Sequence, residues 1–391
     1  MRRRVVVIQR ILPHYRVPFF NLLRELLQER GVDLELIVGQ AAIWESSKND
    51  EGSLPWAKIV KNRYIKFGNR HVVWQPVWAA TRGADLVVVE QASRLLVNYP
   101  LLFGRRFGGP KIASWGHGRN LNLPAGSRLG ETLKRRLLGM SEWWFAYTAG
   151  TADLLQAAGV PSSQIVILQN AIDTKSLAEQ RASVTPDEVA ALRYELGIDS
   201  RAKVGLVLGS IYSEKRPTFV VNSADFIKQA MPDFHLIVAG DGPLRSVFDG
   251  ASATRPWMHV LGNVTGSILT KYAAVSSVIL NPGLVGLSVV DAFALSLPMV
   301  TCSLTYHSPE FSYLVNGENG IVTQPGANEE QFAHSVVELL RDPESLALMS
   351  AMSAASSRIY TLEAMAENYA LGVCLALSDS ARGSLDTNRQ T

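Results

Sequence analysis

The stretch 278–298 constrains the fold of this chain most, because it joins a buried strand, a glycine-rich turn and a helix. Residues 278–280 are an apolar run, and Pro282, Gly283 and Gly286 interrupt it. Ser288, followed three residues later by Asp291, is a capping-box pattern that predicts a helix start. Free backbone N–H groups at the start of this helix would face a negatively charged ligand.

The opening of the chain predicts a doubly wound sheet. Residues 5–8 are a continuous apolar run within a predicted strand over residues 4–8, residues 19–30 have helical periodicity, and a second strand follows over residues 34–38. Such sheets bind ligands beyond the carboxyl ends of their strands. The loop after the first strand carries His14, Tyr15 and Arg16. These side chains are therefore candidates for an acceptor or phosphate loop, and an ordinary solvated loop is the alternative.

A histidine flanked by glycines follows another predicted strand, at residues 111–115. Gly116 and Gly118 stand on either side of His117. Glycine lets the backbone approach a ligand closely, so the pattern predicts an exposed histidine at a strand end. A hydrogen-bonded loop histidine is the alternative reading.

Length and composition predict two domains without disulfides. A chain of 391 residues is too long for one ordinary core. The two cysteines, Cys302 and Cys374, have neither metal-binding spacing nor a disulfide framework, which indicates a reducing compartment. The apolar run after the arginine-rich start is too short for a secretion signal, and no window could span a bilayer. We expect a cytoplasmic protein, with peripheral attachment at the inner face of the membrane as an option.

The charge is distributed unevenly along the chain. Residues 1–170 contain 23 Lys and Arg against 12 Asp and Glu, whereas residues 171–391 contain 15 against 23. A basic first half favours an anionic partner such as a membrane surface, a lipid diphosphate or an acidic glycan. The basic amphipathic pattern over residues 127–140, together with Arg105 and Arg106, is the best candidate for a membrane contact. Nucleic acid is disfavoured because no recognised binding motif occurs.

Three strand ends in the second half resemble family 4 glycosyltransferases. They are residues 203–217, residues 234–245 and the glycine-rich stretch that ends at Asp291. The resemblance implies the GT-B fold, an α/β architecture of two facing Rossmann-like domains. The donor cleft lies between the domains, and a C-terminal helix crosses back to the first one.

The resemblance also implies domain limits. Residues 1–172 would form the acceptor-binding domain, completed by a closing helix at about 358–378. Residues 173–357 would form the nucleotide-sugar-binding domain. Composition separately predicts a flexible tail over residues 379–391.

In this family a Glu, a glycine turn and a second Glu eight residues later hold the sugar, the diphosphate and the ribose. Here Gly283 stands at the first position and Asp291 at the second. An Arg and a Lys after the strand at 203–209 usually hold the diphosphate; Ser210 replaces the Arg, and Lys215 keeps the Lys. Asp291 would therefore accept ribose hydroxyls, and Gly283 would offer the sugar only backbone.

The resemblance gives a full set of candidate site residues. The catalytic candidates are His117, Lys215 and Asp291. The donor-binding candidates are Ser210, Arg216, Val264, Gly283, Leu284, Val285, Gly286, Leu287 and Ser288.

Transfer of a sugar from a nucleoside diphosphate requires stabilisation of the departing diphosphate, by a metal or by fixed cations and a helix start. No Asp-x-Asp pair occurs in the sequence. We therefore expect no metal or other cofactor, with Lys215, Arg216 and the backbone near 286–290 in that role. The resemblance implies a retaining transfer to a glycan or a lipid-linked acceptor in cell-surface polysaccharide synthesis, of the lipopolysaccharide or capsule kind.

Two other functions are compatible with this pattern. A nucleotide-sugar epimerase can share the fold and would need no acceptor. A non-catalytic partner subunit would explain why Ser210 and Gly283 occupy two positions that are usually charged. A nicotinamide dehydrogenase is disfavoured, because no G-x-G-x-x-G follows a strand.

Overall fold

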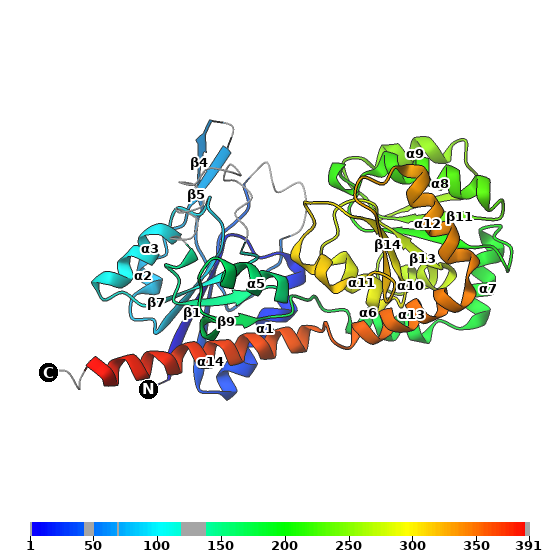
Figure 1. The fold of residues 1–391 in the computed structure, drawn as a ribbon. Coiled ribbons are helices and arrows are strands. Elements are labelled where there is room, and N and C mark those ends of the chain that lie inside the picture. The colour runs from blue at the N-terminus through cyan, green and yellow to red at the C-terminus, as the bar shows by residue number, and fades with distance from the viewer. Residues whose placement is uncertain (1, 43–50, 69, 119–137, 388–391) are drawn as a thin grey trace. The chain divides into compact units, whose positions relative to one another are not determined.

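The computed structural model describes residues 2–42, 51–68, 70–118 and 138–387. The chain divides into two compact units, whose elements are labelled in Figure 1. Unit 1 contains Met1–Ile172 together with Leu362–Thr391, and unit 2 contains Asp173–Thr361. The chain therefore leaves unit 1 after Ile172 and returns to it at Leu362.

Unit 1 is built on a seven-stranded sheet in which all neighbouring strands are parallel. In sheet order, the strands are β3 (Lys58–Ile59), β2 (Val32–Val38), β1 (Arg3–Gln9), β6 (Leu86–Glu90), β7 (Lys111–Gly116), β8 (Trp143–Ala146) and β9 (Ile165–Ile167). Strands β4 (Arg63–Phe67) and β5 (Arg70–Trp74) form a separate antiparallel hairpin.

The helices of unit 1 cover both faces of this sheet. Those described are α1 (Val17–Glu29), α2 (Trp78–Thr81), α3 (Asn98–Gly104), α5 (Ala149–Ala157) and α14 (Leu362–Thr387). Short 3-10 turns occur at η1 (His14–Arg16), η3 (Arg105–Phe107) and η4 (Ser162–Gln164).

The centre of β1, from Val5 to Ile8, is continuously apolar because both faces of the strand are covered. Val5 and Val7 face a core that contains α1 and α14, whereas Val6 and Ile8 face a second core on the α2 and α3 side. Side chains alternate between the faces of a strand, so a strand covered on both faces needs apolar residues at every position. The predicted opening of a doubly wound sheet is confirmed in unit 1.

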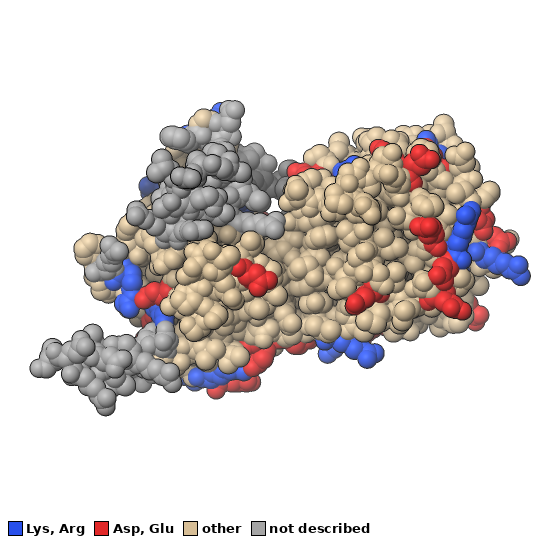
Figure 2. Space-filling view, viewed as in Figure 1, with Lys and Arg blue, Asp and Glu red and all other residues tan. Residues whose placement is uncertain are grey.

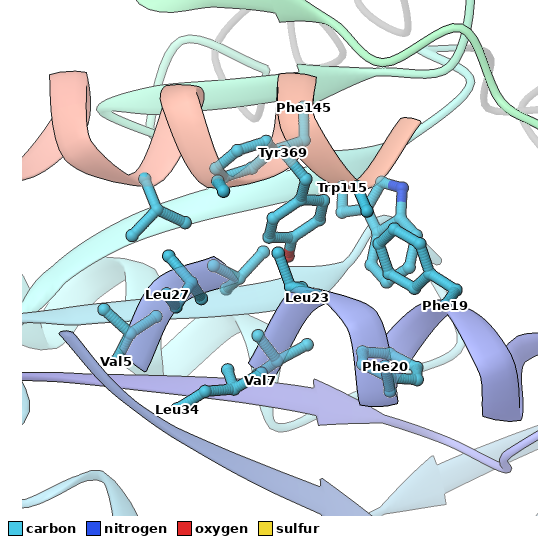
Figure 3. Close-up of a cluster of buried hydrophobic side chains, with 14 of the residues drawn as sticks. Val5, Val7, Phe19, Phe20, Leu23, Leu27, Leu34, Trp115, Phe145 and Tyr369 are labelled. Atoms are coloured by element: carbon cyan, nitrogen blue, oxygen red, sulfur yellow. The ribbon is translucent and has the colours of Figure 1, made fainter. Parts of the chain in front are cut away.

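The long C-terminal helix α14 completes the core of unit 1. Tyr369 is fully buried and stacks on Phe145 of β8, with 4.2 Å between the ring centroids. Its ring also meets Trp115 of β7 and Phe19 of α1 edge to face (Figure 3). Helix α14 therefore joins α1 to the sheet through aromatic contacts.

Unit 2 has a six-stranded parallel sheet, whose strands have the order 3-2-1-4-5-6 typical of Rossmann folds. In sheet order, the strands are β12 (Met258–Gly262), β11 (His235–Ala239), β10 (Val204–Leu208), β13 (Val278–Leu280), β14 (Met299–Cys302) and β15 (Gly320–Thr323). Its helices are α6 (Lys175–Ser183), α7 (Pro186–Glu195), α8 (Pro217–Ala230), α9 (Arg245–Ser252), α10 (Gly266–Val275), α11 (Ser288–Ala294), α12 (Glu329–Arg341) and α13 (Pro343–Ser357).

The closing helix differs from its predicted limits at both ends. It begins at Leu362 rather than 358, because α13 continues to Ser357 and a turn follows before the new helix. It then extends to Thr387, whereas the sequence predicted a tail from residue 379. No helix among the described residues is both long enough and apolar enough to cross a membrane.

Candidate functional site

The candidate site of unit 2 lies where two adjacent strands end. Strands β10 and β13 are parallel neighbours at the point where the strand order reverses, which is where sheets of this kind bind ligands. The loop after β10 leads through the 3-10 turn η5 (Ser213–Lys215) into α8. The loop after β13 contains residues 283–287, here called the glycine loop, and leads into α11.

Gly283 is required by close contact with η5. A Cβ atom added there would overlap the carbonyl oxygen of Glu214 and would lie 2.5 Å from the Cα atom of Lys215. Beside it, the Leu284 N–H donates to the Glu214 carbonyl at 2.8 Å. The backbone of η5 therefore occupies the space that a side chain at position 283 would need.

Lys215 is held against the glycine loop. Its Nζ donates to the carbonyl of Leu284 at 2.7 Å and lies 3.5 Å from the Ser288 hydroxyl. Burial lowers the pKa of Lys215 to about 8, although the attraction of Asp291 acts in the opposite direction. The ammonium is therefore fixed at the start of α11 and remains largely charged at neutral pH.

Asp291 is the carboxylate whose negative charge acts on the Lys215 ammonium. Burial raises the pKa of Asp291 to about 6, and Lys215 partly offsets that rise. No hydrogen bond to its carboxylate occurs within the part of the chain that the structure describes. At neutral pH the group is thus mostly ionised and retains its capacity to accept hydrogen bonds from a ligand.

The predicted capping box at Ser288 is wrong. The backbone is already helical at Leu287, with φ −58° and ψ −15°, and this helix start has no side-chain cap. A capping residue needs extended backbone angles, which Ser288 cannot have as the first helical residue. Asp291 therefore does not cap its own helix.

Fewer backbone N–H groups are free than the predicted residues 286–290. Val289 donates to the carbonyl of Gly286, and Val290 donates to that of Leu287. Among the described residues, the N–H groups of positions 286–288 have no acceptor. The first turn of α11 thus offers three donors next to the Lys215 ammonium.

The two neighbours of Lys215 differ in their placement. Ser210 is exposed, and it lines a small cavity of about 10 Å³ with Lys215 and Asn281. Arg216 has a left-handed backbone, with φ 56°, and its guanidinium lies 3.8 Å over the ring of Phe219. It also donates to the Pro282 carbonyl at 3.3 Å, so its guanidinium is bonded to the backbone just before the glycine loop.

Val264 lies apart from these residues within unit 2. It follows β12, which is separated from β10 by β11 in the sheet. The residue is partly buried. Its position is a strand end on the same sheet, two strands away from the Lys215 loop.

The remaining candidates belong to unit 1. His117 directly follows β7 and is partly buried, with its ring 6.5 Å from that of Tyr147. Next to it, Gly118 donates its N–H to the side chain of Gln91 at 2.8 Å. A Cβ atom at Gly116 would lie 2.7 Å from Gln91, so this glycine allows the turn to pack closely.

Arg16 has a different role from the predicted loop cation. It is only 5% exposed, and its guanidinium donates to Asn170 Oδ1 at 2.6 Å and to the carbonyl of Ala171 at 3.3 Å. The cation also lies over the ring of Trp115, at 5.5 Å. Arg16 is thus part of the core, because the turn η1 directs it inward, while His14 beside it is exposed.

The predicted basic surface is only partly described. Most of the amphipathic pattern at 127–140 falls on residues 119–137, which lie outside the described residues. Arg105 forms an ion pair with Glu142 at 2.9 Å. On the face of unit 2 drawn in Figure 2, basic and acidic side chains lie beside one another, and most of the surface is uncharged.

Sequence reasoning missed two residues that hold the glycine loop. His307 and Ser308 follow β14, and both form hydrogen bonds with the backbone of Val285. A single histidine in a polar loop gave no sequence signal for this contact, because the partners are 22 residues apart.

Part of this chain resembles a known protein family in sequence. Residues 202–342 match the family model described as glycosyl transferases group 1. Alpha-monoglucosyldiacylglycerol synthase from Acholeplasma laidlawii is 26% identical over 211 residues, which are 52% of this chain and 51% of that protein. The match thus spans about half the length of this relative.

Two solved structures resemble the whole chain. A glycosyltransferase from Rickettsia africae is 12% identical with a TM-score of 0.66, and the alignment covers 96% of this chain and 98% of that one. Anabaena HepE, crystallised with UDP, is 14% identical with a TM-score of 0.63, and the alignment covers 95% of this chain and 99% of HepE.

The two Rossmann-like sheets and these structural likenesses define the fold as GT-B, as predicted. Within that fold class, residues 202–342 carry the sequence pattern of the group 1 glycosyltransferases.

Proposed function

We propose that this chain is a glycosyltransferase that moves a sugar from a nucleoside-diphosphate sugar to a glycan or a lipid-linked acceptor. One observation carries the proposal: Lys215 and Asp291 lie together at the switch point of unit 2, inside the segment that matches glycosyl transferases group 1. A cation, free N–H donors and a carboxylate are the groups that a diphosphate and a ribose require.

Lys215 and the N–H groups of residues 286–288 would hold the diphosphate. Their charge and dipoles are already fixed before a donor arrives, which is the arrangement that stabilises a departing anion most effectively. Asp291 would accept the ribose hydroxyls. We infer a transfer without a metal, in which loss of Lys215 reduces the rate on the order of a hundredfold.

Family 4 membership and retention of the anomeric configuration belong to the same proposal. They rest on the spacing of eight residues between Gly283 and Asp291 and on the Lys position. Because Gly283 has no side chain, the donor sugar would meet backbone there. His117 and the loop at His14 and Tyr15 are proposed for the sugar and acceptor side, which lies in unit 1.

The acceptor is inferred from the relatives and from charge. The Acholeplasma relative is named for a glycolipid, which supports a lipid-linked acceptor. A basic first half would suit an anionic membrane, so we place the protein in the cytoplasm at the inner face of the membrane, in cell-surface polysaccharide synthesis.

Calorimetry with UDP, GDP and ADP tests the proposal. We expect one nucleotide to bind the intact chain, and Lys215→Ala and Asp291→Ala each to weaken it about tenfold or more. Lys271→Ala is the matched control, since this lysine lies on the exposed side of α10 and pairs with Glu188. Binding that all three variants retain would place the nucleotide elsewhere.

The partner-subunit alternative keeps one specific observation in its favour. The backbone of η5 leaves no space for a glutamate at position 283. The side chain that would usually contact the donor sugar is therefore missing there. If no nucleotide binds the intact chain in the same calorimetry, this non-catalytic function replaces the transferase.

A further inference from the structure

The glycine loop is held by the loop that follows β14. The Val285 N–H donates to Nδ1 of His307 at 3.0 Å, and the Val285 carbonyl accepts from the Ser308 N–H at 2.9 Å. Both backbone groups of Val285 are thus engaged by consecutive residues of the second loop. Val285 itself is fully buried, so neither bond competes with solvent.

These contacts fix which nitrogen of His307 carries the proton. Nδ1 must accept, because its partner is a backbone N–H. Nε2 lies 2.8 Å from the carbonyl of Cys302, which can only accept, so the proton is on Nε2. The Leu304 N–H lies 3.3 Å from Nε2, but a protonated Nε2 cannot accept it, so the shorter contact with Cys302 sets the tautomer. The ring is therefore neutral, and it stacks on Phe311 with 4.0 Å between centroids.

The bond from Val285 belongs to the same peptide group that holds Lys215. The peptide between Leu284 and Val285 presents its N–H to His307 and its carbonyl to the Lys215 ammonium. A peptide group is planar, so an acceptor at one end fixes the direction of the other end. Hydrogen bonding of the N–H also polarises the carbonyl toward the cation.

We propose that His307 is a positioning residue, which orients the Leu284–Val285 peptide and through it the ammonium of Lys215. Its importance for donor binding rests on the proposed function of Lys215. His307 itself touches neither Lys215 nor Asp291 in any hydrogen bond of the described residues. It acts on Lys215 through the peptide between Leu284 and Val285.

The hydrogen bond from the Val285 N–H to His307, here called the clamp, requires a neutral imidazole ring. A protonated His307 would direct an N–H at the Val285 N–H, and the bond would be lost. The groups that face the ring are the Lys215 ammonium from η5, the carbonyl of Cys302 at the end of β14 and the N–H of Leu304 in the loop that follows. Burial, assisted by the charge of Lys215, lowers the pKa of His307, so the ring stays neutral at neutral pH.

Two substitutions separate this role from simple packing. His307→Gln can keep both bonds, because its amide oxygen can accept from Val285 while its NH₂ donates to Cys302. His307→Leu fills a similar volume with an apolar side chain but offers no hydrogen-bond acceptor. We expect the leucine variant to bind UDP about tenfold more weakly than the intact chain, and the glutamine variant to recover most of that loss. Equal affinities of the two variants would overturn the proposal.

Hydrogen exchange without nucleotide tests the clamp independently of the donor. The Val285 amide should exchange faster in His307→Leu and remain protected in His307→Gln, while amides of β13 exchange as in the intact chain. If UDP, GDP and ADP all fail to bind the intact chain, the proposed function fails, and this measurement still decides whether His307 holds the loop. Unchanged protection of Val285 in the leucine variant would refute the clamp.

A pH series covers the case in which the leucine variant does not fold. UDP affinity of the intact chain should fall more steeply on acidification than that of His307→Gln, because only the histidine loses its acceptor on protonation. Asp291 and the nucleotide phosphates titrate in both proteins, so the difference between the curves reports on His307. Parallel curves would contradict the proposed role.

Discussion

Lys215 and Asp291 are each less favourable in their charged form than they would be in water. Burial raises the pKa of Asp291 to about 6 and lowers that of Lys215 to about 8. The folded state therefore bears a cost at neutral pH, which a bound diphosphate and ribose would relieve. Functional sites commonly contain such groups because ligand binding requires charge in a poorly solvated place.

Asp291→Asn should therefore stabilise the protein while it weakens nucleotide binding. Above pH 6 the folded protein holds an ionised carboxylate that burial disfavours, whereas near pH 4 the carboxyl is protonated in the folded state and the cost disappears. We expect a gain of about 1–2 kcal/mol in the free energy of unfolding at pH 7, after allowance for the lost attraction to Lys215, and almost none at pH 4.

Urea unfolding at both pH values measures this difference. Asp187→Asn is the control, because Asp187 is exposed at the start of α7. A variant that is less stable than the intact chain at pH 7 would show that Asp291 is a stabilising group.

Gly283 is a second residue whose role is set by its surroundings. Gly283→Ala should lower the free energy of unfolding by about 1–3 kcal/mol, because its methyl group overlaps the backbone of Glu214 and Lys215. Gly250→Ala, where no atom lies within 4 Å, should instead stabilise helix α9 by up to about 1 kcal/mol. Chemical denaturation compares the two, and equal effects would contradict the close contact at Gly283.

At the scale of elements, Arg16 joins three segments of unit 1. It lies in η1, and it bonds to Asn170 and Ala171 after β9 and to the sulfur of Met365 on α14. These are the segments by which the chain leaves unit 1 and returns to it. A buried cation of this kind stabilises through hydrogen bonds to fixed oxygens rather than through an exposed ion pair.

Arg16→Met should cost about 1–3 kcal/mol of unfolding free energy, since Asn170 and Ala171 lose this donor. Arg24→Met is the control on α1, where an exposed cation only lies 4.6 Å over the ring of Trp56. Thermal unfolding followed by tryptophan fluorescence measures both variants. If Arg16→Met matches the control, then its buried bonds contribute little.

At the scale of the whole molecule, the fold could be predicted because its signals are local. The positions Val5–Ile8 of β1 are all apolar because both faces of the strand are covered, and glycines mark the loop after β13. The end of α14 was not predictable from its polar sequence. The packing of Glu214 on Gly283 and the bond from Val285 to His307 join residues that are far apart in sequence, and no local pattern records them.

The structure brings some of the predicted site residues together and separates others. Lys215, Asp291 and the glycine loop lie together in unit 2, whereas Arg16 is buried and Arg216 faces Phe219. Charged residues near strand ends look alike in sequence, because the direction of each side chain depends on the turn that carries it.

The most direct test of the proposed nucleotide site is hydrogen exchange of the full chain with and without the nucleoside diphosphate that binds most tightly. We predict that the nucleotide slows exchange in residues 209–216 and 283–291, and leaves the outer strand β15 unchanged. Protection confined to other segments, with none at the ends of β10 and β13, would contradict the assignment of this edge as the donor site.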